Sequence, residues 1–511
     1  MKKNIIIIGG GINGLVAANY LCKFGFNVSV LEKKSGFGGA CTFQTKTING
    51  EKIDYAQGAT VLGMMPNFIF KETGISKNLE IFSPNHPKLV YFTDSKKSTK
   101  IYQDHKKLNF ELKEKWGEKG DLEKFRIDEQ KVINFIRKGY KKAKSPSISE
   151  AEKVLGKTIT NLWIKGSAKN LLDHYFTSER TKRYMGMTCI ESGSSSIHND
   201  GTAFTIPLMD SGSVFDGYWG YVKGGIWKII DELYKINKKN GVKFYESTKI
   251  DSIDNKMKTV SIEKNNIKSV LNYNYLIFAT DPLTPAKLLN NQKFLKSIEK
   301  RDYLGTSGKI TAFFKKPVVW KESSNYKNSD TAFRFVFSNQ NLNEFEESSH
   351  KSSKGLNDYN PCYIQVYAEG AAQRLMKNNE SFDKLIFFIK NFSHNKKADE
   401  LNKIKDQIMS TMFKFIKNPE DCVGTEFLTP KDLTEVFYFP QGNIDHMALN
   451  HDQNFENRHF SNNTENGFYS YADYNNIFYC GAGAYPCGSV AGTAGYMCSV
   501  QLKNKQKTLE N

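Results

Sequence analysis

The chain has 511 residues, of which 39% are hydrophobic and 13% aromatic, and its formal net charge is +18. This apolar content excludes a disordered chain, and the length allows two or three lobes around substantial cores. The eight cysteines show neither metal-ligand spacing nor a Cys-x-x-Cys pair, so we expect no metal centre and no disulfide scaffold.

The N-terminal segment predicts a dinucleotide-binding βαβ unit. A β-rich run at 4–8 enters the turn GGGING at 9–14, and a helical stretch and a second strand follow, ending before Glu32. In this GxGxxG spacing Gly9 permits the tight turn, Gly11 lets the backbone approach a pyrophosphate, and Gly14 lets the helix pack closely on the strand. Glu32 lies where a carboxylate can accept hydrogen bonds from ribose hydroxyls.

The same segment could be mistaken for a secretion signal, because two lysines precede four isoleucines. Glycines interrupt the apolar run at once, which favours a buried strand entering a turn. No uninterrupted apolar run reaches the roughly 18 residues that indicate a membrane-spanning helix. We therefore expect a cytoplasmic protein, either free or bound peripherally to a membrane.

A second glycine turn at 36–40 follows Glu32 and is predicted to extend the phosphate cradle. Cys41 comes directly after it, where dithiol flavoenzymes carry a redox-active disulfide. The partner thiol would stand five residues on, and that position is Lys46. We therefore interpret Cys41 as a bystander in a turn that cradles a cofactor.

The middle of the chain is strongly basic. Residues 96–183 hold 23 Lys and Arg against 12 Asp and Glu. This excess of positive charge indicates either a surface that binds an anionic membrane or an ordinary solvated face rich in lysine. No nucleic-acid recognition motif accompanies it, so we expect no nucleic-acid partner. The stretch 128–144 predicts an amphipathic helix, with Val132, Ile136 and Tyr140 on one face. This helix either packs on the protein's own core or lies on an acidic membrane.

Three stretches favour FAD over NAD: the second glycine turn at 36–40 and two later junctions. A buried strand at 276–279 ends at Thr280 and Asp281, beside the expected cofactor. Near the C-terminus a strand at 477–480 enters the glycine turn GAGAYP and then a helix of small residues. This second strand–glycine–helix junction can aim another helix N-terminus at the pyrimidine carbonyl of a flavin.

Together these segments resemble the phytoene desaturase-like flavoproteins, and within them the branch named pyridine nucleotide-disulfide oxidoreductase domain-containing protein. The motifs that carry the resemblance are GGGINGLVAANYL, LEKKSGFGGA, GYWGYVKGG at 217–225, TPKDLTEVF at 429–437, GNIDH at 442–446 and GAGAYPCGSVAGTAG. The resemblance implies an α/β fold. In it a glutathione-reductase-type FAD-binding domain, built from discontinuous segments, carries an inserted α+β substrate domain on a mixed sheet.

By this resemblance the FAD-binding domain comprises 1–65, 215–290 and 465–505, and the substrate domain comprises 66–214 and 291–464. The resemblance implies FAD as the cofactor and the following binding residues: Gly9, Gly11, Gly14, Glu32, Gly38, Gly39, Ile250, Thr280 and Gly483. One departure is Cys487, which follows Pro486 where the family has glycine. It is either a tether or redox partner of the flavin, or a small residue tolerated in a tight turn.

The resemblance further implies an FAD-dependent oxidoreductase that acts on a hydrophobic, polyene or lipid-like substrate by hydride transfer, desaturation or isomerisation. No second GxGxxG follows a strand within 66–470, so no separate NAD(P)H domain is expected. His446, Asp281 and Trp219 are candidates for contact with the reacting groups, without an assigned role. Two alternatives stay open: an amine or porphyrinogen oxidase reoxidised by oxygen, and a flavin-holding protein that binds partners with little turnover.

Overall fold

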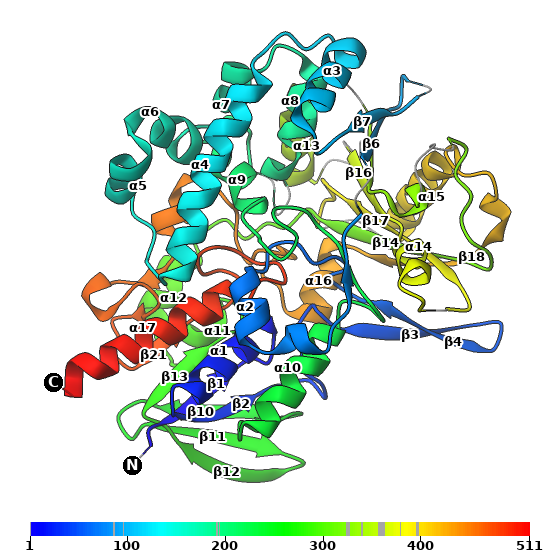
Figure 1. Ribbon diagram of the computed structural model, residues 1–511. Helices are drawn as coiled ribbons and strands as arrows, with labels where there is room; N and C mark the ends of the chain where they lie inside the picture. The colour runs from blue at the N-terminus through cyan, green and yellow to red at the C-terminus, as the bar shows by residue number, and fades with distance from the viewer. Residues whose placement is uncertain are drawn as a thin grey trace.

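A computed structural model describes residues 2–84, 87–95, 97–190, 193, 195–322, 328–338, 341–355, 363–378, 380–394 and 398–510. A parallel sheet occupies the lower part of the molecule, a mixed sheet lies to the right above it, and a group of helices fills the upper left (Figure 1). Both chain ends lie at the lower left, beside the parallel sheet (Figure 1).

The parallel sheet has the strand order β21-β13-β1-β2-β9. Its strands are β1 (Asn4–Ile8), β2 (Asn27–Leu31), β9 (Lys243–Tyr245), β13 (Tyr275–Phe278) and β21 (Ile477–Tyr479). All neighbouring strands are parallel, with Ile5 opposite both Val28 and Tyr275. The four isoleucines of β1 are buried, as a central strand covered on both faces requires. These strands come from the start, the middle and the end of the chain. The loops that follow them therefore meet at the carboxyl-terminal edge of one sheet.

Helices α1 (Ile12–Lys23), α10 (Lys228–Lys239) and α17 (Thr493–Glu510) pack together over this sheet. Close packing depends on two glycines. A Cβ on Gly14 would lie 2.1 Å from the Gly9 carbonyl oxygen, and one on Gly495 would lie 2.1 Å from the Asn13 oxygen. Below the sheet lies an antiparallel meander of β10 (Lys249–Asp254), β11 (Thr259–Lys264) and β12 (Ile267–Asn272) (Figure 1).

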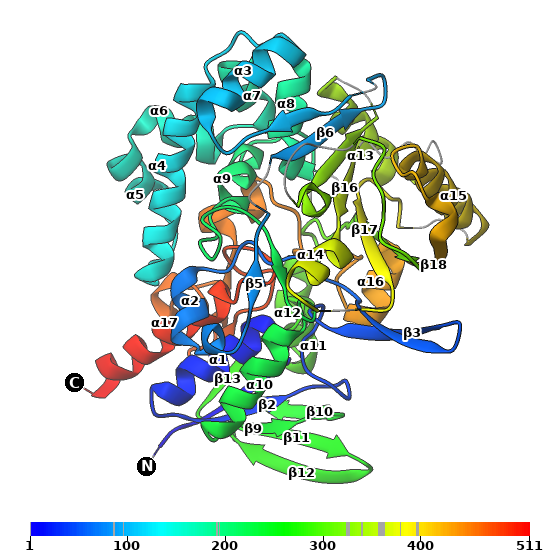
Figure 2. The ribbon, with the colours of Figure 1, turned by 45° about the vertical axis from the view of Figure 1, so that its right-hand side comes forward.

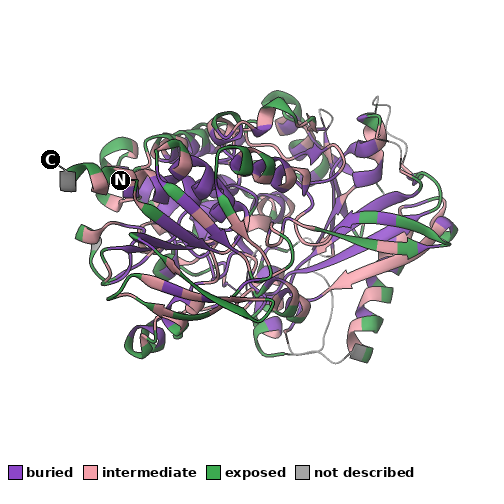
Figure 3. Ribbon diagram, turned by 90° about the horizontal axis from the view of Figure 1, so that it is seen from below, coloured by how far each residue is buried: buried purple, intermediate pink, exposed green. Residues whose placement is uncertain are grey.

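The mixed sheet has seven strands in the order β18-β14-β17-β16-β15-β6-β7, with one parallel pair, β15 and β6. They are β6 (Lys88–Phe92), β7 (Thr99–Ile101), β14 (Gly308–Phe314), β15 (Arg334–Phe337), β16 (Tyr363–Tyr367), β17 (Asp383–Ile389) and β18 (Cys422–Leu428). Helix α15 (Ala398–Phe413) covers one face, with Ile408 and Met412 fully buried against the sheet. Viewed from below, both sheets are largely buried (Figure 3).

The helices at the top and upper left of Figure 1 belong to residues 105–209. They are α3 (His105–Trp116), α4 (Leu122–Lys141), α5 (Ile148–Leu155), α6 (Lys157–Thr160), α7 (Ala168–Tyr175), α8 (Glu179–Met185) and α9 (Thr205–Met209). On α4 the side chains of Val132, Ile136 and Tyr140 are buried in the core. The apolar face predicted for 128–144 therefore packs on the protein's own core, which is the first of the two alternatives for this helix.

Within the described ranges, no helix combines the length and apolarity needed to cross a bilayer.

Further elements connect the two sheets. The hairpin of β3 (Phe43–Ile48) and β4 (Glu51–Ala56) reaches under the mixed sheet, where Lys46 pairs with Glu426 (Figure 2). Strands β5 (Ile81–Phe82) and β8 (Tyr221–Val222) pair, as do β19 (Phe460–Ser461) and β20 (Tyr471–Ala472).

The remaining helices are α2 (Asn67–Glu72), α11 (Leu283–Leu288), α12 (Gln292–Ile298), α13 (Asn343–Ser353), α14 (Glu369–Leu375) and α16 (Pro430–Phe437). Helix α16 lies at the level where the two sheets meet (Figures 1 and 2).

Candidate active site

A cavity of about 690 Å³ lies between the parallel and mixed sheets. One wall consists of turns at the carboxyl ends of the parallel strands; it includes Gly9, Gly11, Ile12, Asn13, Glu32, Gly38, Gly39, Thr280, Asp281 and Ala482. The opposite wall is mostly apolar and includes Met209, Trp219, Tyr367, Ile386, Phe388, Leu428, Leu433, Phe437, Phe439 and Ile444. The cavity can therefore hold a ligand that is polar at one end beside a second, apolar molecule.

The three glycines of the first turn differ in what they do. Gly9 has φ +105°, and a Cβ there would lie 2.9 Å from the backbone of Ala279. Gly14 is needed for packing the helix on the turn. Around Gly11, by contrast, the nearest heavy atom to a Cβ is the Gly39 Cα at 3.9 Å. Gly9 and Gly14 thus maintain the fold, whereas Gly11 keeps the cavity open.

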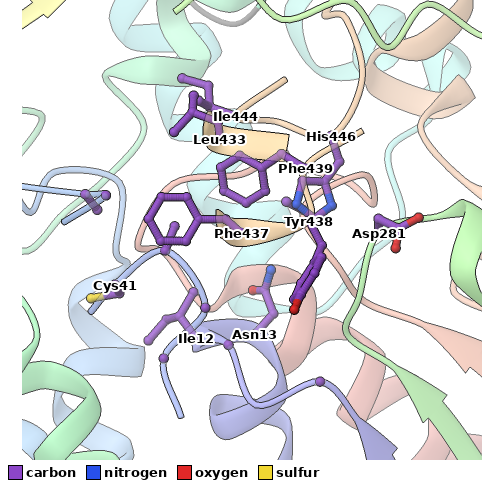
Figure 4. A pocket seen from close by; sticks show the side chains of 18 of the residues that line it. Ile12, Asn13, Cys41, Asp281, Leu433, Phe437, Tyr438, Phe439, Ile444 and His446 are labelled. Carbon is purple, nitrogen blue, oxygen red and sulfur yellow. The ribbon is translucent and has the colours of Figure 1, made fainter. Parts of the chain in front are cut away.

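The N-terminus of α1 meets the cavity at Gly11, Ile12 and Asn13 (Figure 4). Across the described residues, no side chain caps this end, and its first turn carries no acidic residue. The first N–H groups of a helix have no intrahelical acceptor and carry partial positive charge. They are suited to bind the phosphates of a dinucleotide.

Glu32 is held at the cavity edge by two backbone donors. Its carboxylate accepts hydrogen bonds from the Gly10 N–H at 2.8 Å and the Lys34 N–H at 2.9 Å. The backbone N–H of Thr248 donates to the Glu32 carbonyl oxygen at 2.9 Å, which brings Ile250 into the same wall. The carboxylate is thereby oriented, with acceptor capacity left for a hydroxyl.

The second glycine turn packs on the first. The Gly38 N–H donates to the Gly10 carbonyl oxygen at 2.8 Å, and both Gly38 (φ +129°) and Gly39 (φ +60°) line the cavity. Cys41 is buried beside it, and its thiol donates to the Ile226 carbonyl oxygen at 3.5 Å. Burial raises the pKa of this thiol well above its usual range, so it stays protonated at neutral pH. Cys41 forms no disulfide with any described residue.

Replacing Cys41 with serine is expected to change both cofactor affinity and turnover by less than about threefold. A protonated thiol without a second cysteine to form a disulfide has no redox role. Absorbance titration with FAD and steady-state turnover check this result. A hundredfold loss of turnover with normal cofactor affinity would contradict the bystander interpretation.

Thr280 and Asp281 line the cavity at the end of β13, as the sequence placed them. The Asp281 carboxylate accepts hydrogen bonds from the N–H groups of Leu283 and Thr284, at 2.9 and 3.0 Å, and from the Thr284 hydroxyl. These bonds cap α11. The carboxylate is thus occupied by the first turn of the helix, a structural role that its position in the sequence did not reveal.

At the C-terminal turn the cavity is lined by Ala482, Ser489 and Val490. Gly483 lies behind them, and its N–H donates to the Tyr479 hydroxyl at 3.2 Å. Cys487 is buried outside the lining, with its sulfur 3.9 Å from the sulfur of Met64. The glycine turn predicted around Gly483 is therefore present, but its neighbours, rather than Gly483 itself, line the cavity.

Trp219 lies in the wall opposite the glycine turns. Its ring packs on the backbone of Gly63, where a Cβ would come within 2.1 Å of the ring. Met209 lies in the same wall. The indole is fixed by this contact and contributes apolar surface to the cavity.

His446 also lines the cavity, in the loop after β18 and α16, with its ring centroid 5.0 Å from that of Phe439 (Figure 4). It is buried. Burial, together with the nearby Arg458 guanidinium, lowers the pKa of His446 to about 3. The imidazole is therefore neutral over the physiological range.

Lys309 on β14 is a cavity residue that the sequence analysis did not identify. It is buried, and its ammonium donates to the carbonyl oxygens of residues 56, 57 and 58, at 2.5, 3.3 and 2.8 Å. Burial lowers the pKa of Lys309 to about 7; Glu369 raises it and Lys384 lowers it further. A group with this pKa inside a cavity can give or take a proton near neutral pH.

An aromatic cluster at residues 437–439 closes one side of the cavity (Figure 4). A capping box between Thr429 and Asp432 starts α16, which ends at Phe437, and Tyr438 then adopts the left-handed conformation (φ +60°). The Lys34 ammonium donates to the Val436 carbonyl oxygen, and that of Lys33 lies 4.6 Å from the Tyr438 ring centroid. The end of α16 is thus attached to the residues that follow Glu32.

Comparison with known proteins agrees with this geometry. Residues 7–64 match the NAD(P)-binding Rossmann-like domain family. A phytoene desaturase of Fusarium fujikuroi is 27% identical over 269 residues, 50% of this chain and 44% of that protein. The chain thus spans about half the length of the phytoene desaturases it matches. Pyridine nucleotide-disulfide oxidoreductase domain-containing protein 2 of Rattus norvegicus is 22% identical over 560 residues, 96% of this chain and 91% of that protein.

Among solved structures, cyclohexylamine oxidase from Brevibacterium oxydans superposes with a TM-score of 0.59 at 15% identity, over 100% of both chains. A likeness at this identity shows the shared fold. The matches thus agree on a Rossmann-like nucleotide-binding domain at residues 7–64 and on an overall fold shared with this oxidase. In sequence the chain is thus similar to phytoene desaturases and to the pyridine nucleotide-disulfide oxidoreductase domain-containing protein, the resemblance that the sequence motifs predicted.

Proposed function

We propose that the cavity binds FAD along its glycine-turn wall and a hydrophobic substrate, a polyene or another lipid-like molecule, along its apolar wall. The single observation that carries this proposal is the shape of the site. One cavity joins the N-terminus of α1 to an extended surface of aliphatic and aromatic side chains from the mixed sheet and α16. The reaction is a hydride transfer that desaturates or isomerises the substrate.

The residues present fit FAD. The space beside Gly11 that a Cβ would fill, the free N-terminus of α1 and the oriented Glu32 carboxylate suit a pyrophosphate and an adenosine ribose. The parallel sheet draws its strands from 1–65, 215–290 and 465–505, which supports a glutathione-reductase-type cofactor domain in those three segments. The mixed sheet supports a substrate domain in 66–214 and 291–464.

Bound FAD supplies a hydride acceptor and donor at its ring system. The protein supplies placement and a dry environment. The apolar wall excludes water from the reacting groups, and Trp219, fixed on Gly63, limits how the substrate can lie. Lys309 can hold or release a proton at Nζ beside the cavity and also fixes the backbone at residues 56–58, which leads into the lining residues Gly58 and Ala59.

Charge in the cavity favours an uncharged substrate over an amine. The described lining holds more basic than acidic side chains: the acidic ones are Glu32, Asp281 and Asp445, and the basic ones include Lys33, Lys34, Lys249 and Lys309. A protonated amine would also meet the Lys309 ammonium below pH 7. We therefore place the amine oxidase second to a hydrophobic substrate.

Anaerobic titration of the FAD-loaded protein tests the source of hydride. Because no second dinucleotide turn follows a strand in 66–470, we expect NADPH to leave the visible flavin band unchanged and a hydrogenated polyene to bleach it. Rapid bleaching by NADPH would instead indicate a reductase or a reduced-flavin isomerase. A band that no apolar substrate alters would favour the flavin-holding, partner-binding alternative.

A further inference from the structure

The loop 442–446 lies where two walls of the cavity meet. Its Asn443 side chain is fully buried and donates to the Leu304 carbonyl oxygen at 3.2 Å, close to the start of β14. Its Asp445 carboxylate accepts the Gly488 N–H at 2.8 Å, in the C-terminal glycine turn. His446 is therefore held between the turn expected at the flavin and the strand that carries Lys309.

The His446 imidazole is a buried polar group whose Nδ1 is unpaired within the part of the chain that the structure describes. The residue is only 8% exposed, and its Nδ1 finds no hydrogen-bond acceptor or donor among the described residues. The ring faces the cavity beside Phe439 (Figure 4). A buried donor or acceptor left unpaired is costly, so such a group in a native protein calls for a partner that the chain itself does not provide.

The backbone at His446 adds a second cost. Its φ is +64°, in the left-handed region that non-glycine residues seldom occupy. The loop is nonetheless fixed, because the Arg458 guanidinium donates to the carbonyl oxygens of Asp445 at 2.6 Å and Ala482 at 3.2 Å. A strained backbone that aims an unpaired imidazole into a cavity is typical of a ligand contact.

The charge state narrows the ligand chemistry. With its pKa lowered to about 3 by burial and by Arg458, the imidazole is neutral, so one nitrogen donates and the other accepts. A charged ligand group would lose its hydration in this buried site, and a neutral imidazole cannot offset that cost. It fits an uncharged oxygen, such as a hydroxyl or a carbonyl.

We propose that His446 is a ligand-binding residue that forms a hydrogen bond with an uncharged hydroxyl or carbonyl oxygen inside the cavity. This inference rests on the proposed function, in which FAD and a hydrophobic substrate share that cavity. The oxygen belongs either to the cofactor or to the substrate. In the second case the substrate is an oxygenated lipid-like molecule, such as an alcohol or aldehyde, rather than a pure hydrocarbon.

Two substitutions separate hydrogen bonding from shape. His446→Phe keeps a ring of similar size without nitrogen atoms. His446→Asn keeps a donor and an acceptor, and asparagine is among the side chains that best tolerate the left-handed backbone. Two affinities are measured for each protein: that of the apoprotein for FAD, and those of the FAD-loaded protein for hexadecan-1-ol and hexadecane, from perturbation of the flavin spectrum.

We expect H446F to weaken one of these affinities by about tenfold, the size of one net hydrogen bond, and H446N to keep most of it. A loss of FAD affinity with an unchanged preference for the alcohol over the alkane places the oxygen on the cofactor. Unchanged FAD affinity with loss of that preference places it on the substrate. If H446F stays within twofold of the wild type in both measurements, the proposal is overturned.

If H446F does not fold, His446→Gly replaces it, because glycine suits the positive φ. Restoration of the lost affinity by added imidazole would support the proposal, and an affinity that never fell would overturn it. Failure of this inference is distinguishable from failure of the proposed function. If the wild type and H446F bind FAD and apolar ligands equally well, only the role of His446 is refuted. If the wild type binds no FAD, both the proposed function and the role of His446 are refuted.

Discussion

Replacing Gly11 with valine is expected to lower FAD affinity at least hundredfold while leaving the protein folded. The backbone at Gly11 has φ −73° and ψ 179°, which valine adopts without strain, and the nearest described atom to a Cβ there is the Gly39 Cα at 3.9 Å. The added side chain instead occupies the space beside the N-terminus of α1 that a pyrophosphate needs. Titration of the apoprotein with FAD, followed by absorbance, measures the loss.

The matched control is Gly139→Val on α4. A Cβ at Gly139 also has 3.9 Å of clearance, but this residue lies outside the cavity lining. Both variants should melt within a few degrees of the FAD-free wild type, since neither substitution meets a close contact. Normal FAD affinity in the Gly11 variant would show that the cofactor binds elsewhere.

Replacing Lys309 with methionine is expected to lower turnover about hundredfold with a much smaller effect on FAD affinity. The substitution keeps an unbranched apolar side chain out to Cε and removes Nζ, the group that can exchange a proton beside the cavity, a loss that typically costs two to four orders of magnitude. The wild-type rate should change with an apparent pKa near 7, the value to which burial lowers Lys309. In the variant that inflection should disappear.

Lys309→Arg tests whether charge alone suffices. Arginine stays protonated throughout the working range, so this variant should keep the positive charge but lose the inflection near pH 7. Turnover in Lys309→Met that matches the wild type, with the inflection retained, would assign the pH dependence to another group. It would also limit Lys309 to holding the backbone at residues 56–58.

The parallel sheet could be predicted from the sequence because its signals are local. The apolar run of β1, the glycines that follow it and Glu32 lie within one short segment, and each residue type has one physical reason to be there. The helix at 128–144 shows the limit of such reasoning. Its pattern gives an amphipathic helix, but only the packing of Val132 and Ile136 inside the core decides what its apolar face covers.

The apolar half of the cavity could not be predicted, because its residues come from strands that pair over long sequence distances. Lys309 meets the carbonyl oxygens of residues 56–58 across some 250 positions. One signal was present in the sequence: a lysine inside the mostly apolar strand GKITAFF is expected to be buried, and a buried lysine needs hydrogen-bond partners. For Asp281 the reverse holds, since its position at a strand end marked it as a site residue while its carboxylate caps α11.

The central claim is that this cavity holds FAD, and the visible absorption spectrum of the purified protein tests it most directly. We predict flavin bands in the visible range and, after denaturation, release of close to one FAD per chain. A folded protein that purifies colourless and shows no spectral change on titration with FAD would contradict the account.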